Sequence, residues 1–459
     1  MQFCKWFVVK NLNVRRQGLR ATLSIYDSAM NLNAPTDFIA DLKWRGLLHQ
    51  TTSDLLGGHL LTSGRLAYCG FDPTSDSLTV GNLLPIMMLA RWQQAGHRPI
   101  VLMGGATGLI GDPSGKSAER QVISAEKVRH HIARQRPIFA RVLDFTGSNA
   151  ASVVDNAEWL MKIGYIEMLR DVGKFFSVNQ MVARDSVATR LTEREQGISY
   201  TEFSYMILQA YDFLHLHRTA GCTVQIGGAD QWGNICSGID LIRRISSADA
   251  YGITNQLVTK SDGTKIGKSE SGAIYLNADR TSPYRFHQFW MNAADDDALK
   301  FLKWFTFLSH EKIEAISLAH KSDPAARLAQ KTAADELTTM VHGETETQRA
   351  GLCAKALFGG DIRDLDEQSA IDVAADLPGP RLTRDALAES GKLVVDLLVE
   401  SALASSKREA REFLETGAVQ VNGERVTLES RVAADSLLHG SFAFIRRGKR
   451  NWAVAEFAK

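Results

Sequence analysis

The 459-residue sequence predicts an α/β protein, in which a doubly wound parallel sheet is followed by a helical domain and a small α+β unit. Three observations predict this order. From about residue 38 to 277, short apolar runs alternate with longer helical patterns. Residues 282–376 show helical patterns without convincing strands, and residues 392–459 fit two helices, a strand and a hairpin.

The first of these regions supplies the sheet. Residues 65–71 are predicted to form a strand, residues 81–94 a helix that ends at Gly96, and residues 99–103 the next strand. A glycine-rich loop follows, and a later strand, 223–226, leads into another pair of glycines. Because ligands of such sheets bind at the carboxyl ends of the strands, the loops that follow these strands are expected to form the site.

Composition divides the chain further. We expect a poorly ordered extension at 1–37, a sheet domain at 38–281, a helical domain at 282–376, a linker at 377–391 and a small domain at 392–459. The extension is basic, so a targeting segment is an alternative. A start assigned too early, with Met30 as the true start, is another.

Charge and cysteine content exclude several classes. The formal charge is +1, so no strong overall field favours nucleic acid or a membrane, although the sum combines an acidic body with mildly basic ends. The five cysteines form no Cys-x-x-Cys pair and are odd in number, which argues against a disulfide framework or a zinc site and favours a reducing cytoplasm. No apolar run reaches the roughly 18 residues of a membrane span, so we expect a soluble protein. The spacing of the histidines also lacks a zinc-helix pattern, so we expect no protein-bound metal.

One helical segment carries polar side chains at a regular spacing. Tyr205, Gln209 and Asp212 lie at i, i+4 and i+7 of a predicted helix over 201–216, so they project from one face. The neighbouring side chains are apolar, so a carboxylate at Asp212 needs a polar partner. A capped or salt-bridged Asp212 and a contact to a ligand both satisfy that need.

At this point the sequence resembles the bacterial tyrosyl-tRNA synthetases, a class I aminoacyl-tRNA synthetase family with a Rossmann-type catalytic domain. The resemblance runs from about residue 38 to the C-terminus, and its motifs are 68–74, 104–116, 201–212, 225–234 and 265–269. It implies activation of L-tyrosine with ATP to tyrosyl-adenylate and pyrophosphate, then transfer of the tyrosyl group to the 3′-terminal ribose of tRNA(Tyr). It also implies Mg²⁺ accompanying ATP, a helical domain that binds the anticodon stem, and a homodimer.

The resemblance assigns the substrate site residue by residue. Tyr68 and Asp212 are expected to flank the phenolic hydroxyl of tyrosine, and Gln231 to approach its carboxylate. Its ammonium is expected near Asp72, Asp112, Tyr205 and Gln209.

The nucleotide and the departing pyrophosphate have their own expected contacts. The ATP site is expected to include Cys69, Gly70, Thr79, Gly81, Asn82, Gly228, Asp230 and Lys268. The catalytic contacts expected at the phosphates are Thr74, Lys116, Arg120, Lys265, Lys268 and Ser269. A packing role for Cys69 remains an alternative.

The C-terminal domain resembles the small RNA-binding module that ends bacterial members. Its expected tRNA contacts are Lys407, Arg408, Arg411, Arg446, Arg447, Lys449 and Arg450.

One departure from the family is clear. The signature that usually reads His-x-Gly-His is here Thr79-Val80-Gly81-Asn82. Asn82 can still donate a hydrogen bond to the ribose, and the helix N-terminus is expected to offer N–H groups to the triphosphate. This departure leaves open an RNA-binding relative with impaired catalysis. The nearest alternative within the class is a tryptophanyl-tRNA synthetase, against which Tyr68 and Asp212 argue.

Overall fold

The computed structural model describes residues 37–114, 123–184, 187–188, 191, 197–257, 259–261, 263–264, 266–269, 272–387 and 390–458. The predicted extension therefore lies almost entirely outside the described residues. In the part of the chain that is described, no helix combines the length and the apolar character that crossing a bilayer requires.

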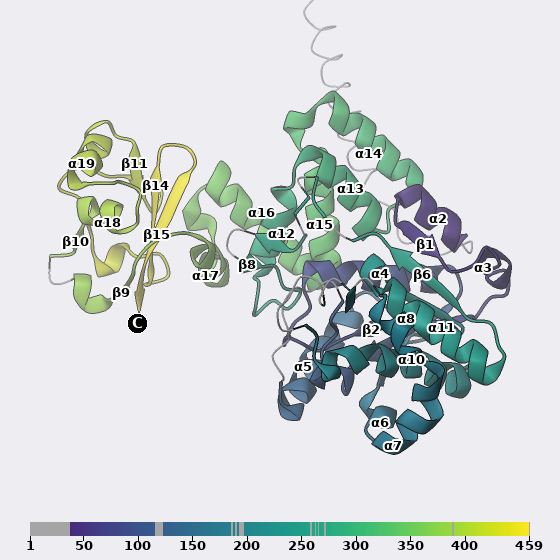
Figure 1. Ribbon diagram of the computed structural model, residues 1–459. Coiled ribbons are helices and arrows are strands. Elements are labelled where there is room, and N and C mark those ends of the chain that lie inside the picture. The colour runs from purple at the N-terminus through teal and green to yellow at the C-terminus, as the bar shows by residue number, and fades with distance from the viewer. Residues whose placement is uncertain are drawn as a thin grey trace, which may run out of the picture.

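A six-stranded sheet forms the centre of the larger unit (Figure 1), and its strands follow the order β1-β6-β5-β2-β3-β4. The strands are β1 (Leu48–Thr51), β2 (Leu66–Phe71), β3 (Arg98–Met103), β4 (Ser152–Asp155), β5 (Val224–Gly228) and β6 (Tyr251–Asn255). All neighbours are parallel except β1 and β6. The three strands predicted for this sheet are confirmed.

The order of the strands locates the binding edge. From β2 the chain runs outward through β3 to β4 on one side, and β5 and β6 lie on the other. The direction of winding therefore changes between β2 and β5. At such a switch point the loops diverge and leave a crevice at the carboxyl ends of the strands.

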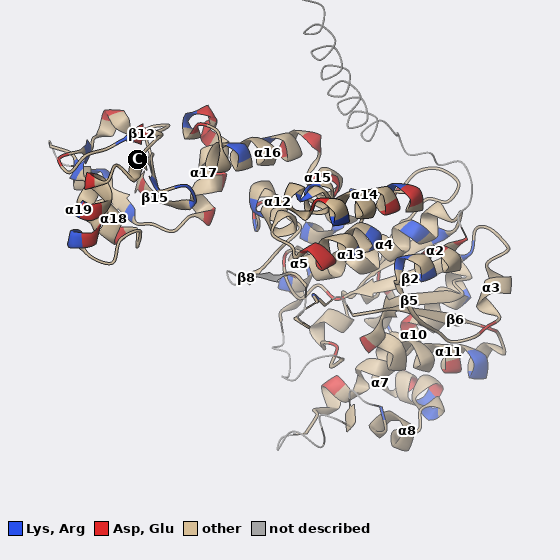
Figure 2. Cartoon of the chain, turned by 90° about the horizontal axis from the view of Figure 1, so that it is seen from above, with Lys and Arg blue, Asp and Glu red and all other residues tan. Residues whose placement is uncertain are grey.

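Helices cover both faces of the sheet (Figure 2): α4 (Val80–Gln94) lies on one face, and α10 (Tyr200–Ala220) and α11 (Trp232–Ser246) lie on the other. The remaining helices of this unit are α2 (Phe38–Arg45), α3 (Leu56–His59), α5 (Ala125–Phe139), α6 (Ala157–Leu160), α7 (Tyr165–Glu167) and α8 (Val178–Val182). The predicted helix 201–216 is real but longer, because Ser199 caps its start and Gly221, at φ 72°, ends it.

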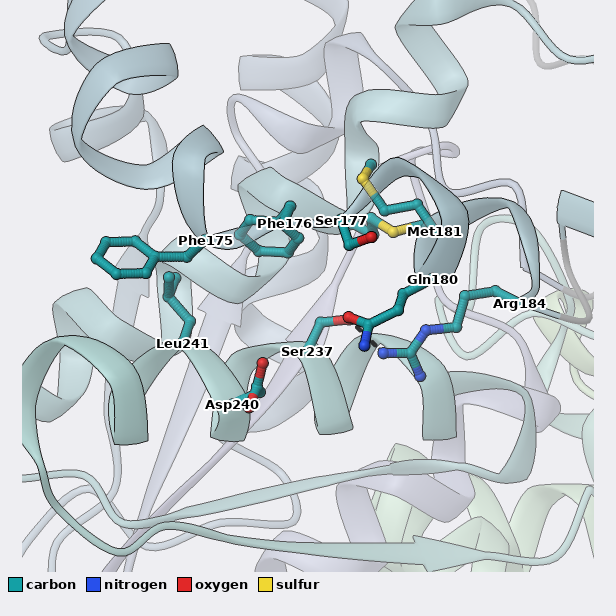
Figure 3. Close-up of a pocket in the computed structure, with 10 residues that line it drawn as sticks. Phe175, Phe176, Ser177, Gln180, Met181, Arg184, Ser237, Asp240 and Leu241 are labelled. Atoms are coloured by element: carbon teal, nitrogen blue, oxygen red, sulfur yellow. Dashed lines mark hydrogen bonds between the residues drawn. The ribbon is translucent and has the colours of Figure 1, made fainter.

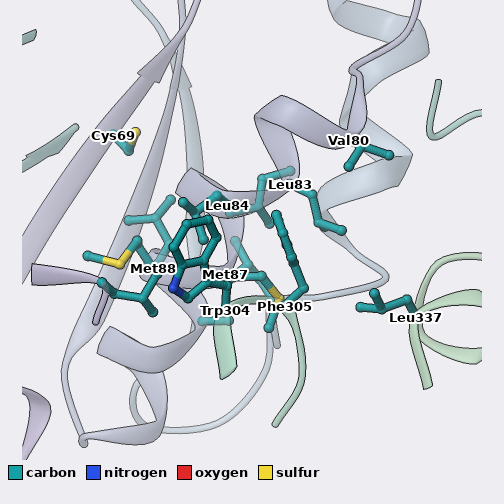
Figure 4. Close-up of a cluster of buried hydrophobic side chains, with 14 of the residues drawn as sticks. Cys69, Val80, Leu83, Leu84, Met87, Met88, Trp304, Phe305 and Leu337 are labelled. Carbon is teal, nitrogen blue, oxygen red and sulfur yellow. The ribbon is translucent and has the colours of Figure 1, made fainter. Parts of the chain in front are cut away.

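The helical region is α12 (Pro283–Met291), α13 (Asp295–Phe305), α14 (His310–Ser322), α15 (Leu328–His342), α16 (Glu344–Phe358) and α17 (Glu367–Asp376). It does not have a core of its own. Side chains of α12, α13 and α15 share one buried cluster with α4 (Figure 4), where Met87, Phe305 and Leu337 are all buried. Helix α4 is apolar both on the side that faces the sheet and on the opposite side. The second layer of helices buries this opposite side.

The C-terminal unit is built on a five-stranded sheet of order β12-β11-β14-β15-β9. Its strands are β9 (Arg381–Thr383), β11 (Val419–Val421), β12 (Glu424–Arg425), β14 (Phe442–Arg447) and β15 (Asn451–Ala458); β10 (Lys392–Leu393) and β13 (Arg431–Val432) pair separately, and the helices are α18 (Val394–Glu400) and α19 (Lys407–Glu415). The predicted linker 377–391 needs correction, because β9 pairs in parallel with β15 and Leu387 is buried in this core.

The C-terminal sheet packs on the end of the helical region. Phe444 and Trp452 share a buried cluster with residues of α16 and α17, and Trp452 Nε1 donates to the carbonyl of Leu357 at 2.9 Å. A buried apolar interface with a specific hydrogen bond fixes the two units against each other.

Candidate active site

A cavity of about 530 Å³ lies at the switch point of the sheet. Its walls come from the carboxyl ends of β2 and β5, the start of α4, one face of α10 and the loop around Ile266. Most of the predicted tyrosine and nucleotide contacts line it: Tyr68, Cys69, Gly70, Asp72, Thr74, Thr79, Gly81, Asn82, Asp112, Tyr205, Gln209, Asp212, Gly228, Asp230 and Gln231. A volume in this range suits a small organic ligand.

A buried carboxylate lies at the closed end of the cavity. Asp212 is only 2 % exposed, and its two oxygens accept hydrogen bonds from Trp159 Nε1 at 2.7 Å and Asn156 Nδ2 at 2.9 Å. Burial raises the pKa of Asp212 to about 7, and the two donors only partly offset this. Among the described residues, Asp212 is thus hydrogen-bonded without a cationic partner, which leaves lone pairs on its oxygens for a ligand.

Trp159 and Asn156 are themselves held in place. The Trp159 ring stacks on His215, with ring centroids 4.3 Å apart, and Asn156 Oδ1 accepts from the backbone N–H of Ala106 at 2.8 Å. Asn156 is fully buried. Because both donors are fixed by further contacts, the orientation of the Asp212 carboxylate is fixed before any ligand binds.

Tyr68 brings a hydroxyl to the same end. Its ring packs against Phe213, and its Oη is buried with no hydrogen-bond partner among the described residues. Burial and the nearby charge of Asp212 raise the pKa of Tyr68 well above its ordinary value, so it stays a neutral hydroxyl. An unpaired buried hydroxyl costs about 1–3 kcal/mol, a cost that a hydroxyl-bearing ligand would remove.

The middle of the cavity holds a second carboxylate. Tyr205 Oη donates to Asp72 Oδ2 at 2.9 Å, and Thr107 Oγ1 donates to Asp72 Oδ1 at 2.9 Å. Tyr205 has committed its proton to Asp72, so its oxygen faces a ligand as an acceptor. A carboxylate beside such an acceptor suits an ammonium group.

An amide chain completes this wall. Gln231 Nε2 donates to Asp112 Oδ2 at 2.7 Å, Gln209 Nε2 donates to Gln231 Oε1 at 3.1 Å, and Asn234 Nδ2 donates to Gln209 Oε1 at 2.9 Å. The chain fixes which atom of each amide faces the cavity. The predicted ammonium contacts Asp72, Asp112, Tyr205 and Gln209 are therefore brought together, and Gln231 lies beside them.

The nucleotide side shows close backbone approaches. A Cβ added at Gly228 would lie 2.6 Å from Asp230 Oδ1, so no other residue fits there without a shift. Cys69 lines the cavity and also belongs to the core, and burial raises the pKa of its thiol to about 12. It is a neutral thiol with a packing role, which keeps the alternative interpretation of Cys69 in place.

The start of α4 differs from the expectation of free N–H groups. The backbone N–H of Val80 donates to the carbonyl of Ile274 at 3.0 Å, and that of Asn82 donates to the carbonyl of Thr79 at 2.9 Å. The N–H of Thr79 donates to Asn82 Oδ1 at 3.0 Å. The expected anion site at this helix N-terminus is thus wrong for these three groups, because the chain itself already satisfies them.

The predicted loop cations are only partly visible. Lys116, Arg120 and Lys265 lie outside the described residues, and for Lys268 and Ser269 the structure describes the backbone, as strand β7 (Lys268–Ser269) paired with β8 (Gly272–Ala273). The loop backbone touches α4, since a Cβ added at Gly267 would lie 3.3 Å from the backbone nitrogen of Gly81. Gly267 has a φ of 85°, which also favours glycine.

The predicted tRNA contacts separate into three groups. Arg446 lies over the Trp452 ring and donates to Gln420, and Arg447 lies over the Phe413 ring and donates to the carbonyl of Leu403, so both are tied into the fold. Lys407 and Arg408 pair with Asp396 and Glu412. Of the predicted tRNA contacts, Arg411, Lys449 and Arg450 are exposed and form no ion pair with the described residues.

Sequence reasoning missed the partners of Asp212. Asn156 and Trp159 come directly after β4 and at the start of α6. A polar residue at the carboxyl end of a parallel strand was the available signal, but residues 152–155 had not been predicted as a strand.

A second recess lies apart from this cavity, between α8, α10 and α11 (Figure 3). It holds only about 30 Å³, and Arg184 reaches across it to donate to Ser237 at 3.0 Å. It has room for about two water molecules and not for an amino acid.

Comparison with known proteins finds tyrosine–tRNA ligases and their domains as relatives along most of the chain. Residues 64–359 match the family model described as tRNA synthetases class I (W and Y), and residues 375–455 match that of the tyrosine–tRNA ligase SYY-like C-terminal domain. The chain is 49 % identical to the tyrosine–tRNA ligase of Opitutus terrae over 91 % of its length and 98 % of that protein, and 49 % identical to that of Geobacillus kaustophilus over 92 % and 100 %. The structure of a C-terminally truncated mitochondrial tyrosyl-tRNA synthetase from Aspergillus nidulans matches with a TM-score of 0.63 at 30 % identity, over 70 % of this chain and 94 % of that one.

Proposed function

The chain belongs to the tyrosine–tRNA ligase family of class I tRNA synthetases, and we propose that it activates L-tyrosine with ATP and transfers the tyrosyl group to tRNA(Tyr). The observation that carries the choice of amino acid is the closed end of the cavity, where the Asp212 carboxylate and the unpaired Tyr68 hydroxyl lie together. A phenolic hydroxyl can donate to the first and accept from the second. An indole ring offers a donor and no acceptor, so it leaves Tyr68 unpaired.

The remaining contacts orient the amino acid. Its ammonium lies between Asp72, Asp112 and the oxygen of Tyr205, and its carboxylate points past Gln231 toward the nucleotide. This arrangement is supported by the hydrogen bonds that turn acceptor atoms toward the middle of the cavity. Holding both reactants in this geometry supplies much of the rate enhancement without a general base.

Activation is an attack of a tyrosine carboxylate oxygen on the α-phosphorus of ATP. The bond from that phosphorus to its bridging oxygen breaks, and pyrophosphate leaves with the electron pair. Gly70, Gly228 and Asp230 face the nucleoside in this proposal. Charge on pyrophosphate is neutralised by the loop cations Lys116, Arg120, Lys265 and Lys268, with Mg²⁺ that enters on ATP.

ATP–pyrophosphate exchange tests this proposal. We expect exchange that depends on tyrosine and is at least a hundredfold weaker with tryptophan or phenylalanine, since the discrimination comes from unpaired buried groups. Exchange that depends on tryptophan would replace the proposed substrate. No exchange with any amino acid, together with intact tRNA binding, would favour an RNA-binding relative with impaired catalysis.

The transfer step requires a tRNA surface, and we place it on the C-terminal unit. Arg411, Lys449 and Arg450 are exposed and free of the intramolecular contacts that hold Arg446 and Arg447. Exposed cations on one small unit can replace counterions on tRNA phosphates.

A homodimer completes the proposal, in the reducing cytoplasm that the five scattered cysteines favour. Ile166 and Tyr165 in α7 and Tyr200 at the start of α10 are large apolar side chains with 60–71 % exposure, and the two tyrosine hydroxyls are 3.2 Å apart. An apolar patch of this kind on the surface of one protomer fits a second copy of this chain. Ile166→Asp is expected to produce monomers, as measured by light scattering, and a dimer that survives it would contradict this interface.

A further inference from the structure

Thr79 occupies the position at which this family usually has a histidine, and the structure shows what its side chain does. Thr79 Oγ1 donates a hydrogen bond to Asn82 Oδ1 at 2.9 Å. The backbone N–H of Thr79 donates to the same oxygen at 3.0 Å. The carbonyl of Thr79 in turn accepts from the backbone N–H of Asn82, so the two residues cap the start of α4 reciprocally.

Two donors on one amide oxygen settle the orientation of the Asn82 side chain. A flipped amide would place its NH₂ group against the backbone N–H of Thr79, and these are two donors. The oxygen therefore faces Thr79, and Nδ2 is the group left for other partners. Asn82 lines the cavity, and within the described residues nothing accepts a hydrogen bond from its Nδ2.

The same contacts limit what Thr79 can offer to a phosphate. Its hydroxyl hydrogen and its backbone hydrogen are both used by Asn82. Its backbone is also held by a bridge to Tyr275, and the next N–H, that of Val80, donates to Ile274. The remaining lone pairs of the Thr79 hydroxyl repel an anion, so this side chain is a poor ligand for a triphosphate.

We propose that Thr79 is a positioning residue, which holds the Asn82 amide with its two Nδ2 hydrogens toward the nucleotide and makes no contact of its own with the triphosphate. This inference rests on the proposed function, because it concerns ATP bound in this cavity. The family's histidine is thus replaced here by a threonine that orients the neutral Asn82 amide toward the ribose of the nucleotide and does not touch the phosphates.

A double-mutant cycle tests the coupling between the two residues. Thr79→Val keeps the shape of the side chain and removes its donor, and we expect KM for ATP to rise about 2- to 10-fold, the worth of one neutral hydrogen bond. Thr79→Ser retains the hydroxyl and is expected to recover most of this affinity. In an Asn82→Ala background, the same Thr79→Val change is expected to alter KM for ATP less than about twofold. Equal losses in both backgrounds would overturn the proposal.

The reverse reaction separates positioning from phosphate binding. With enzyme-bound tyrosyl-adenylate and added pyrophosphate, we expect KM for pyrophosphate to be unchanged in Thr79→Val. A rise in that KM to match the rise for ATP would show that Thr79 binds the phosphates directly, and would overturn the proposal.

Two further measurements make a failure interpretable. Thr219→Val removes a threonine hydroxyl from the exposed end of α10, and it controls for general effects of such a change on KM. Tyrosine-dependent exchange by the unaltered protein tests the proposed function separately. If the unaltered protein shows this exchange but the double-mutant cycle shows no coupling, the proposed role of Thr79 is refuted and the proposed function stands.

Discussion

Asp212→Asn is the substitution that most sharply tests how the cavity selects its amino acid. The two side chains have the same shape, but the amide carries no charge and replaces one acceptor oxygen with an NH₂ group. In the structure, both oxygens of Asp212 accept hydrogen bonds, from Trp159 and Asn156. The amide therefore meets one of these donors with a donor of its own.

The magnitude follows from these contacts. A hydrogen bond to a charged group contributes about 1.5–3 kcal/mol, which corresponds to about 10- to 150-fold in affinity. Loss of the bond from the phenolic hydroxyl is thus expected to lower kcat/KM for tyrosine by about this factor. Phenylalanine makes no such bond, so its kcat/KM is expected to change by less than about threefold. The ratio for unaltered enzymes of this specificity is about 10⁵, a known value for the family and not one worked from these distances.

The assay is ATP–pyrophosphate exchange with each amino acid at saturating ATP. Asp171→Asn, an exposed aspartate that pairs with Arg170, is the matched control, and we expect it to leave both values unchanged. If Asp212→Asn lowers exchange with tyrosine and with phenylalanine by the same factor, Asp212 does not bind the phenolic hydroxyl. That result would refute the proposed basis of amino-acid selection.

The pH dependence supplies a second readout of the same carboxylate. Burial raises its pKa to about 7 from an ordinary value near 4, so the ionised form is lost as pH falls through 7. Tyrosine affinity is expected to weaken about tenfold between pH 8 and pH 6, because the ionised fraction falls by about that factor. The Asp212→Asn variant is expected to lack this dependence, and a matching slope in the variant would contradict it.

Three further predictions concern other contacts. Trp159→Phe removes one donor to Asp212, so we expect the pKa that controls tyrosine binding to rise and KM for tyrosine at pH 7 to increase about 3- to 30-fold; an unchanged pH profile would contradict this. Phe444→Ala empties a buried position between the C-terminal sheet and α16–α17, so we expect about 3–5 kcal/mol of lost stability in denaturant unfolding, with exchange activity retained. Lys449→Ala with Arg450→Ala is expected to weaken tRNA binding and reduce its salt dependence while leaving exchange unchanged, and an unaltered salt slope would move the tRNA surface elsewhere.

The sequence alone predicted the parts of the fold with strong local signals. The strands that end near Gly70 and Gly227 were identified because their apolar runs are clear and end at glycine. The helix with Tyr205, Gln209 and Asp212 on one face was identified by its periodicity, and it also ends at a glycine. These are also the elements that meet at the switch point, so most of the cavity could be predicted.

The remainder depends on contacts between segments far apart in the chain. No local pattern shows that Trp159 reaches Asp212, or that the apolar outer face of α4 binds α13 and α15. Arg446 and Arg447 belong to a basic hairpin of the kind that binds RNA. Their guanidinium groups nevertheless lie over aromatic rings of this chain, which the sequence does not show. The role of Thr79 could not be predicted from the sequence either, because it depends on a hydrogen bond between its hydroxyl and the side-chain amide of Asn82.

The placement of tyrosine against Asp212 and Tyr68 is tested most directly by a crystal structure with a non-hydrolysable tyrosyl-adenylate analogue. We predict that the phenolic oxygen lies within about 3 Å of both a carboxylate oxygen of Asp212 and the hydroxyl of Tyr68. A phenolic oxygen that contacts neither group, or an analogue bound outside the cavity at the switch point, would contradict it.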